Sequence, residues 1–574
     1  MSDQISDRRA KLAKLREMGV DPFGARFDNV VSHAAIRAAA EKLDIAAGQV
    51  LELPDACFRA AGRVVLHRDI GSLIFLTVRD RTGDLQYGIS KKMLAEGVER
   101  LRSQGAEGRE QGTGNREQGE GSGERGTANR ESGEGGRPAR REGTGEQGVG
   151  DAGAAVPTFP RPHVPASPPP HVPTSPPPHV PTQTAWPVAK LLDLGDIIGV
   201  EGRLGRTKTG ELTLWCTSLT LLSKSLRPPP PEWYGLKDVE LRYRRRYVDL
   251  YANPASRDVF IQRARIIDHI RRVLHDRGFI EVDTPVLQPI YGGAAARPFV
   301  THHNTLDMRL YLRISPELYL KRCLVGGLER VYELARCFRN EGISPRHNPE
   351  FTMLELYQAY GDYHDMMDIC EALVGGAARD VIGSTKIAFG NREIDYTTPW
   401  PRRTYADLFA EYVGVPLTDI MAVRARAREL KIEEQKLDDA VVVNKLFEHH
   451  VEPHLVNPTF VVDYPAPLCP LTKRHPADPS LALRFELYIN GMELGNAYSE
   501  LNDPDVQREN LAGQVAGEGE ETMRVMDEDF CEALEYGMPP AGGLGIGIDR
   551  LVVLLTGSPS IRDVLLFPLQ RPQT

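Results

Sequence analysis

The sequence predicts an α+β protein of several domains, in which a small N-terminal β-barrel precedes a larger unit of strands and helices. Three observations predict this fold class. The chain has 574 residues, which is too many for a single hydrophobic core. Five short strand-like runs, separated by turn residues, lie in its first part. Beyond residue 256, helical spacing and strand-like alternation follow each other to the C-terminus.

Composition excludes several classes of protein. No apolar run of eighteen residues occurs and the N-terminus is charged, so neither a membrane span nor secretion is expected, and a cytoplasmic location is predicted. The net charge of −9 argues against a surface built for nonspecific nucleic-acid binding, although a local basic groove is compatible with it. The 7 cysteines are scattered without a CxxC pair, which predicts packing residues instead of a zinc site or a disulfide framework.

The barrel is predicted at residues 51–226, after an N-terminal helical segment at 1–50. The runs CFRAAGRVVLHRD, SLIFLTVRD and GDLQYGIS supply three strands, and DIIGVEGRLGRTKTGELTLWCTSLTLL supplies two more. Five such strands fit an OB-fold, a common platform for single-stranded nucleic acid. The strand count alone favours a generic small barrel, so both interpretations stay open at this point.

Residues 103–187 interrupt the barrel between its third and fourth strands, after a predicted helix at 91–101. This segment begins as a Gly-, Glu- and Arg-rich sequence and ends with three PHVP units. The first part lacks apolar residues to bury, and the second favours polyproline II. We therefore expect a disordered insertion, and the sequence assigns it no function.

A proline-rich linker is predicted at 227–255, before the large unit at 256–574. Its cluster RYRRR, at 242–246, is either a basic contact for nucleic acid or a solvated stretch, with similar support for each. The large unit opens with helical apolar spacing over 257–277, followed by the strand-like GFIEVDTPVL. Residues near 375–455 are predicted to be more helical, and strands return after them.

The run FTMLELY alternates, so Phe351, Met353, Glu355 and Tyr357 are expected to share one face of a strand. An unpaired buried carboxylate is costly, and a cationic or hydrogen-bonding group should therefore cover Glu355. A solvated acidic face on an edge strand is an equally good interpretation of this run taken alone.

The segment RFELYINGMELGNAYSEL predicts a hairpin with Asn490 and Gly491 as its two-residue turn. This register places Glu486 opposite Gly495 and makes Glu486 and Glu493 a diagonal pair within about 7 to 8 Å. Two acids so placed suit Mg²⁺, which binds through carboxylates and substrate phosphates. Two solvated glutamates are at least as well supported by the spacing alone.

Two further residues of this hairpin, Asn496 and Glu500, are placed on its opposite face by the same alternation. A bulge or bend near Gly495 would be needed to bring them to the face of the paired acids. The sequence does not decide whether the strand contains one.

The run GGLGIGIDRLVVLLTG predicts a glycine-punctuated strand that leads into a helix. Gly543, Gly545 and Gly547 alternate, so one face of the strand lacks side chains and could receive a flat ligand. Arg550, near the helix start, could stack on a base or reach a phosphate. Close backbone packing explains the glycines equally well.

Together these pieces resemble a known family. The helix and strand ending in Pro285, the stretch CFRNEGISPRHNPEFTMLELYQAY, and GLGIGIDR resemble motifs 1, 2 and 3 of class II aminoacyl-tRNA synthetases. The stretches GGAAARPFVTHHNTLDMRLYLRISPELYLKRCLVGG and FELYINGMELGNAYSELND resemble the bacterial lysyl-tRNA synthetases. The resemblance covers nearly everything outside 103–187. It implies an OB-fold anticodon-binding domain and a class II catalytic domain, whose antiparallel sheet is flanked by helices.

The resemblance also implies a reaction and its site residues. The enzyme would activate L-lysine with ATP to lysyl-adenylate and pyrophosphate, then transfer lysine to the 3′-terminal adenosine of tRNA(Lys). The implied catalytic residues are Arg339 and Arg550. The implied ATP-binding residues are Glu341, His347, Asn348, Phe351 and Arg550. The implied lysine-binding residues are Glu317, Glu355, Tyr357, Asn496 and Glu500.

Further ligands and partners follow from the same resemblance. Glu486 and Glu493 match the family's Mg²⁺ ligands, with two or three ions expected alongside ATP. The implied anticodon-binding residues are Arg68, Phe75, Gln86 and Glu211. Motif 1 implies a homodimer, and no membrane partner is expected.

Alternative functions are less well supported. The enzymes for aspartate and asparagine share this domain layout, but acids in the pocket should select a cationic substrate. A relative that lysylates a translation factor would lack the barrel. A synthetase-like RNA-binding protein without catalysis would have lost the motif arginines or the metal acids, and all of these are present.

Overall fold

The computed structural model describes most of the chain, namely residues 2–97, 185–230, 236–432, 435, 437–516 and 526–573. The chain divides into two compact units, residues 1–231 and residues 232–574. Most of the predicted insertion at 103–187 lies outside the described residues. Its last three residues begin helix α4 (Ala185–Lys190), so the predicted boundary is three residues too late. The reason is packing, because Ala185 is buried in the core of the first unit.

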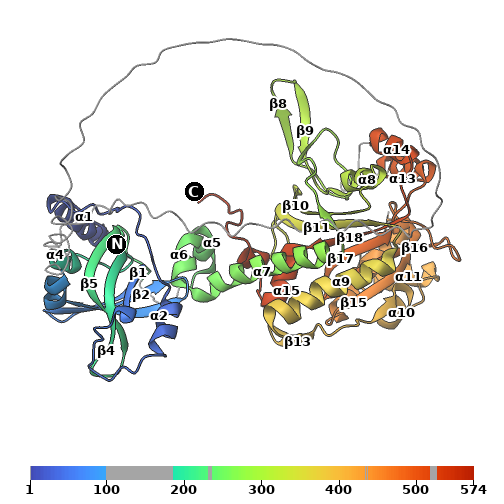
Figure 1. Cartoon of the computed structure of the whole chain (residues 1–574). Coiled ribbons are helices and arrows are strands. Elements are labelled where there is room, and N and C mark those ends of the chain that lie inside the picture. The colour runs from blue at the N-terminus through green and yellow to red at the C-terminus, as the bar shows by residue number, and fades with distance from the viewer. Residues whose placement is uncertain are drawn as a thin grey trace, which may run out of the picture. The chain divides into compact units, whose positions relative to one another are not determined.

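The first unit is a closed five-stranded barrel of the OB type (Figure 1). Its strands follow the order β1-β2-β3-β5-β4, with β3 and β5 parallel and the other neighbours antiparallel. The strands are β1 (Cys57–Asp69), β2 (Leu73–Asp80), β3 (Gly83–Ser90), β4 (Ile197–Arg206) and β5 (Leu212–Ser223). Helices α1 (Ser2–Glu17) and α2 (His33–Ala40) precede them. Residues 91–97 are helical, as expected, and the rest of that predicted helix lies outside the described residues.

The second unit is built on an eight-stranded mixed sheet of order β14-β15-β16-β17-β18-β11-β10-β6 (Figure 1). Its central pairs are antiparallel, whereas β14–β15 and β10–β6 are parallel. The strands are β6 (Ile280–Glu281), β10 (Arg330–Phe338), β11 (Glu350–Ala359), β14 (Arg402–Thr404), β15 (Thr459–Pro465), β16 (Leu481–Ile489), β17 (Met492–Ser499) and β18 (Ala541–Gly547). Of the strand-like GFIEVDTPVL, only β6 and part of β7 (Leu287–Gln288) form strands.

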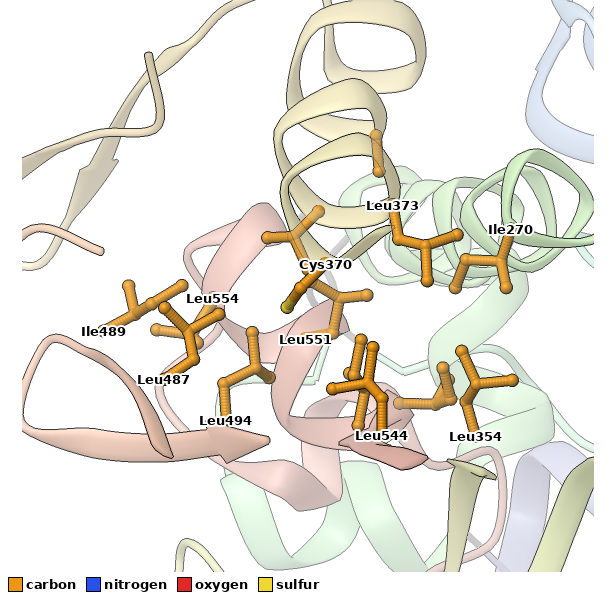
Figure 2. Packing of buried hydrophobic residues seen from close by; sticks show 14 of the residues in the cluster. Ile270, Leu354, Cys370, Leu373, Leu487, Ile489, Leu494, Leu544, Leu551 and Leu554 are labelled. Atoms are coloured by element: carbon orange, nitrogen blue, oxygen red, sulfur yellow. The ribbon is translucent and has the colours of Figure 1, made fainter. Parts of the chain in front are cut away.

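Three helices cover one face of this sheet, while α8 (Glu317–Val325) packs against β10 and β11 on the other. They are α7 (Pro254–Asp276), α9 (Tyr363–Ala377) and α15 (Ile548–Thr556). Figure 2 shows Ile270, Leu373 and Leu551 from these helices above leucines of the sheet. Truncating one such buried leucine to alanine costs about 2–5 kcal/mol. The apolar residues predicted on helix 257–277 therefore form this core.

The remaining elements surround the sheet. A small sheet contains β7, β8 (Val300–His303) and β9 (Met308–Leu312), and a hairpin contains β12 (Lys386–Phe389) and β13 (Arg392–Asp395). The further helices are α5 (Val239–Arg244), α6 (Arg246–Ala252), α8 (Glu317–Val325), α10 (Tyr405–Val413), α11 (Ile420–Glu429), α12 (Asp439–His450), α13 (Pro504–Ala516), α14 (Glu528–Glu535) and α16 (Ile561–Val564). Short 3₁₀ helices lie at Pro54–Ala56, Glu452–His454 and Ala466–Leu468, and a short π-helix lies at Ala378–Ile382.

The arginine cluster at 242–246 is not the solvated stretch that one sequence interpretation described. Arg246 is buried, with Nη1 2.8 Å from Asp249 Oδ2 and Nη2 donating to the Arg562 carbonyl oxygen at 2.7 Å. Arg244 pairs with Glu240 at 2.7 Å. These contacts make the cluster part of two packed helices, because each guanidinium that is buried finds acceptors there.

Two predictions from composition can be compared with the described residues. All seven cysteines are free, and five of them are buried, in agreement with a packing role. Within the described ranges, no helix combines the length and the apolar character that crossing a membrane requires.

Candidate active site

The face of the sheet opposite α7, α9 and α15 carries two adjoining cavities, and strand β11 contributes to both. Met353, Glu355 and Tyr357 line a cavity of about 340 Å³. Phe351 and Met353 line a second cavity of about 140 Å³. The alternation read from the sequence is therefore confirmed. The two cavities share part of their walls, formed by Arg339, Met353, Asn496 and Gly545.

The first cavity is acidic, and Glu355 lies in its wall. This side chain is buried, with Oε1 accepting from Ser315 Oγ at 2.8 Å and Oε2 accepting from Tyr357 Oη at 3.2 Å. Burial, reinforced by the charge of Glu317, raises the pKa of Glu355 to about 8. A cation brought next to this carboxylate would restore its charge.

Two more acids, Glu317 and Glu500, are bridged from behind by Lys321. Its Nζ lies 2.7 Å from Glu317 Oε1 and 2.5 Å from Glu500 Oε2. Tyr498 Oη donates to the other oxygen of Glu317 at 3.0 Å. Burial raises the pKa of Glu500 to about 8 even though Lys321 opposes the shift. Glu317 lines the cavity directly, whereas Glu500 lies just beneath its lining.

Glycine is required at Gly543, which lines this cavity on β18. A Cβ atom there would clash with Glu500 Oε1 and would lie 2.5 Å from Tyr357 Cε1. At Gly547, which lines the second cavity, the nearest atom to such a Cβ is 3.6 Å away. Close packing therefore explains the glycine at 543, whereas at 547 a Cβ would make only ordinary van der Waals contacts with the protein.

The β16–β17 hairpin turns at Asn490 and Gly491, as predicted, and both have positive φ. The predicted register is wrong beyond the turn, because Glu486 lies opposite Asn496 instead of Gly495. Leu494 is the extra residue of a β-bulge, and its side chain joins the apolar core. The bulge brings Asn496, Tyr498 and Glu500 to the face that carries the paired acids, which is the condition the sequence left undecided.

The paired acids Glu486 and Glu493 fit a divalent cation by their chemistry. Glu486 accepts from Arg484 and from the hydroxyls of Tyr464 and Tyr488, the latter two at 2.8 and 2.5 Å. Burial, with the charge of Glu493 adding to it, raises the pKa of Glu486. A cation would relieve this repulsion. No cluster of three metal-ligating side chains occurs among the residues that the structure describes, so substrate oxygens would have to complete the coordination.

The second cavity is lined by arginines and by the loop before β11. The guanidinium of Arg339 lies 5.1 Å from the centroid of the Phe351 ring, and its Nε has no hydrogen-bond partner. Arg550, in the first turn of α15, donates from Nη1 to the Glu493 carbonyl oxygen at 2.6 Å. Its Nη2 lies 3.2 Å from His347 Nε2. Burial and the nearby Arg550 lower the pKa of His347, which favours the neutral imidazole.

The other two residues predicted to bind ATP also line this cavity. Glu341 is exposed in the loop. Asn348 donates from Nδ2 to the Glu350 carbonyl oxygen at 2.6 Å, and its buried Oδ1 has no partner. All the residues predicted for ATP and most of those predicted for the amino acid are thus brought together on one sheet face.

The four residues predicted to read the anticodon share the outer face of the barrel. Arg68 and Phe75 are cross-strand partners on β1 and β2. Gln86 lies two positions from Gly88, the partner of Phe75 on β3. Gln86 also pairs with Thr213, two residues after Glu211, so the alternation places Glu211 on this face too.

Sequence reasoning missed several residues that the structure brings to these surfaces. Trp215 packs edge-on to Phe75, with ring centroids 5.8 Å apart. Its ring lies over Gly88, where a Cβ would be 2.7 Å from Trp215 Cε3. In the acidic cavity the missed residues are Ser315, Lys321, Arg484 and Tyr498. Two signals were available, since Lys321 is one helical turn from Glu317 and Tyr498 alternates with Asn496.

Comparison with known proteins gives a consistent result. The family model described as class II tRNA synthetases (D, K and N) matches residues 238–571. The lysine–tRNA ligase of Moorella thermoacetica is 43% identical over 578 aligned positions, covering 100% of this chain and 98% of the relative. That of Pelotomaculum thermopropionicum is 44% identical, with 100% and 96% covered. That of Bacillus subtilis is 40% identical, with 100% and 98% covered.

Proposed function

The chain belongs to the class II tRNA synthetases (D, K and N), and on this premise we propose how it acts as a lysine–tRNA ligase. It activates L-lysine with ATP, forming lysyl-adenylate and pyrophosphate. It then transfers lysine to the 3′-terminal adenosine of tRNA(Lys). Full-length similarity to lysine–tRNA ligases supports this activity over that of the aspartate and asparagine enzymes.

The observation that carries the proposal is the acidic cavity joined to an arginine-lined one. Glu355, Tyr357 and the free Oε1 of Glu500 offer acceptors to the ε-ammonium of lysine. Glu317 and Asn496, also at this cavity, would hold the α-ammonium. These groups suit a substrate with two ammonium groups, whereas the carboxylate side chain of aspartate would be repelled.

Arg339 stands at the wall common to both cavities and would orient the reacting groups. Its guanidinium can bind the lysine carboxylate on one side and the α-phosphate of ATP on the other. The carboxylate oxygen then attacks phosphorus in line and pyrophosphate leaves. Proximity and charge neutralisation supply the catalysis, so the step needs no nucleophile from the protein.

The second cavity would hold ATP. Phe351 offers an apolar ring face to the adenine, and Arg550 would cover the opposite side. Glu341 would accept from the adenine amino group, while His347 and Asn348 would contact the phosphates and ribose. Glu486 and Glu493 would hold Mg²⁺, which supplies positive charge to the phosphate oxygens when it is bound.

The barrel would bind the tRNA anticodon through its outer face. Phe75, next to Trp215, offers a stacking surface, and Arg68, Gln86 and Glu211 offer hydrogen-bonding groups for base edges. Because tRNA and ATP are its substrates, we assign the protein to the cytoplasm.

A homodimer through motif 1 is also proposed. The outer side of α7 has an apolar groove of about 550 Å³, lined by Phe260, Ile261 and Leu566 among others. Phe567, next to Leu566 in the chain, is 73% exposed and extends the apolar surface of this groove. Light scattering of the purified protein tests this assembly, since a monomer would contradict it.

The test of the activity is ATP–pyrophosphate exchange with each of the twenty amino acids. Exchange with lysine alone is expected. Exchange with aspartate or asparagine would overturn the assignment of the acidic cavity while keeping the class. Absence of exchange with every amino acid would overturn the enzymatic function.

A further inference from the structure

Lys321 is the buried charged residue of the acidic cavity that the proposed reaction does not use. It lies in the second turn of α8 and has no exposed surface. Its Nζ contacts Glu317 Oε1 at 2.7 Å and Glu500 Oε2 at 2.5 Å, and it lies 5.6 Å from the centroid of the Tyr498 ring. The ammonium is therefore surrounded by the same acids and aromatic rings that would bind a substrate ammonium.

Stability alone gives a weak account of this arrangement. Taking an ammonium and two carboxylates out of water is costly, and apolar residues of similar volume often replace buried ion pairs without loss of stability. Burial would lower the pKa of Lys321, but Glu317 and Glu500 together raise it above its ordinary value, so the group stays charged. A cation fixed at this position must then affect how the cavity binds another.

The charges of the cavity balance only when Lys321 is counted. The cavity region contains three carboxylates, from Glu317, Glu355 and Glu500, and the cations Lys321 and Arg339, while Arg484 in the lining is neutralised by its ion pair with Glu486. A bound lysine adds two ammonium groups and one carboxylate, which brings the sum to zero. Without Lys321, one buried negative charge would lack a partner.

We propose that Lys321 is a specificity-determining positioning residue, whose ammonium fills the deepest cation position of the pocket and so sets how far the substrate side chain enters. This inference rests on the proposed lysine activation. The position between Glu317 and Glu500 is occupied by the protein itself. The substrate ε-ammonium is left with Glu355, Tyr357 and the free Oε1 of Glu500.

Removing the charge has a consequence that simple loss of packing does not share. A vacant acid pair would attract the substrate ε-ammonium more deeply than the chemistry allows. The α-carboxylate would then be drawn away from Arg339, and near-attack geometry would be lost. The rate constant should fall more than the affinity for lysine.

The experiment compares three variants in lysine-dependent ATP–pyrophosphate exchange. Lys321→Met keeps the length of the side chain without its charge, and we expect kcat to fall at least tenfold while KM for lysine changes less. Lys321→Ala leaves room for n-propylammonium, which reproduces the missing atoms and should restore at least a fifth of the wild-type kcat. The matched control is Lys224→Met in the barrel unit. Lys224 is equally buried between two acids, Asp193 and Asp196, at 2.6 and 2.8 Å.

Neutral 1-propanol, which fills the same space, separates charge from volume. Rescue of Lys321→Ala by the amine but not by the alcohol supports the proposal, with wild type at the same amine concentration as reference. Three results would overturn it. The first is equal rescue of Lys321→Ala by the amine and by the alcohol, and the second is no rescue by the amine although thermal melting shows that Lys321→Ala is folded. The third is a kcat of Lys321→Met within twofold of the wild-type value. If wild type itself showed no lysine-dependent exchange, the proposed function would fail instead. If Lys321→Ala does not fold, the kcat of Lys321→Met still tests the proposal.

Discussion

The two cavities on this face of the sheet differ in burial and in the charged groups that they offer to a ligand. The first is lined by acids that are almost fully buried, such as Glu355 at 4% exposure, and each is held by a neighbouring side chain. The second is lined by arginines that reach solvent, with the Arg550 side chain 28% exposed. A buried acid rejects wrong ligands strongly, because an unpaired charge there is costly. The comparison indicates that the buried cavity selects the amino acid, whereas the more exposed cavity neutralises the charge of the phosphates.

The largest effect is expected from substitution of Arg339, which lies in the wall that the two cavities share. Arg339→Ala should lower kcat/KM for lysine-dependent exchange by about 10³, because a preorganised donor to the reacting groups is lost. Arg339→Lys should recover little, since a point charge cannot replace the planar fork. The control is Arg336→Ala on β10, three residues before Arg339. The Arg336 side chain is 44% exposed and pairs with Glu350. Similar losses in both variants would contradict the assignment.

The acidic cavity is tested on its own by Glu355→Gln. We expect KM for lysine to rise on the order of 10²-fold with KM for ATP nearly unchanged, because a charge-assisted acceptor is lost in a buried site. Glu350→Gln, which alters an exposed carboxylate of the same strand, is the matched control. Equal effects on the two substrates would show that the cavities are not separate in function.

The glycines of β18 sharpen the comparison without changing any charge. Gly543→Ala should raise the Kd for lysine about tenfold, because its Cβ would displace Glu500 and Tyr357. Gly547→Ala should leave lysine bound as before, since its Cβ would meet no protein atom closer than 3.6 Å, and should weaken ATP binding, because that Cβ lies at the cavity proposed for ATP. Titration calorimetry with lysine measures the first, and ATP titration measures the second. Reversed sensitivities would exchange the roles of the cavities.

The smallest effect concerns pH. The pKa of Glu355 is raised to about 8, so this carboxyl group is mostly protonated in the empty pocket at pH 6.5. Lysine binding requires the carboxylate and should release protons, so its Kd should fall about three- to tenfold between pH 6.5 and 8. Calorimetry in buffers of different ionisation enthalpy counts the protons. ATP binding alone should release none from this group, and Glu355→Gln should flatten the lysine profile.

Much of this architecture could be predicted from sequence periodicity. The alternation of β11, the Asn490–Gly491 turn and the strand-to-helix passage at Arg550 are local patterns, and each was confirmed. The bulge at Leu494 could not be predicted from the sequence. An extra residue in one strand is recognised only when the residues opposite it on the partner strand are known. Lys321 was missed for a similar reason, since its second partner Glu500 is distant in the chain.

The roles of the site residues depend on resemblance more than on pattern. Two glutamates at the spacing of Glu486 and Glu493 are equally compatible with a solvated hairpin. The structure adds that Glu486 is enclosed by Arg484 and two tyrosines, which a sequence of alternating residues cannot predict. Packing between segments that are far apart in the chain decides such surroundings.

The extra residue at Leu494 has an evolutionary consequence. A strand repeats every two residues, and one additional residue resets this phase between Glu493 and Asn496. The part of β17 before the reset carries the candidate metal ligand, and the part after it carries candidate amino-acid contacts. Substitutions after the reset can therefore change which amino acid is accepted while the phosphate chemistry is inherited intact. If Leu494 were instead paired as a regular strand residue, the later side chains would turn to the core and the two sets of contacts would be separated.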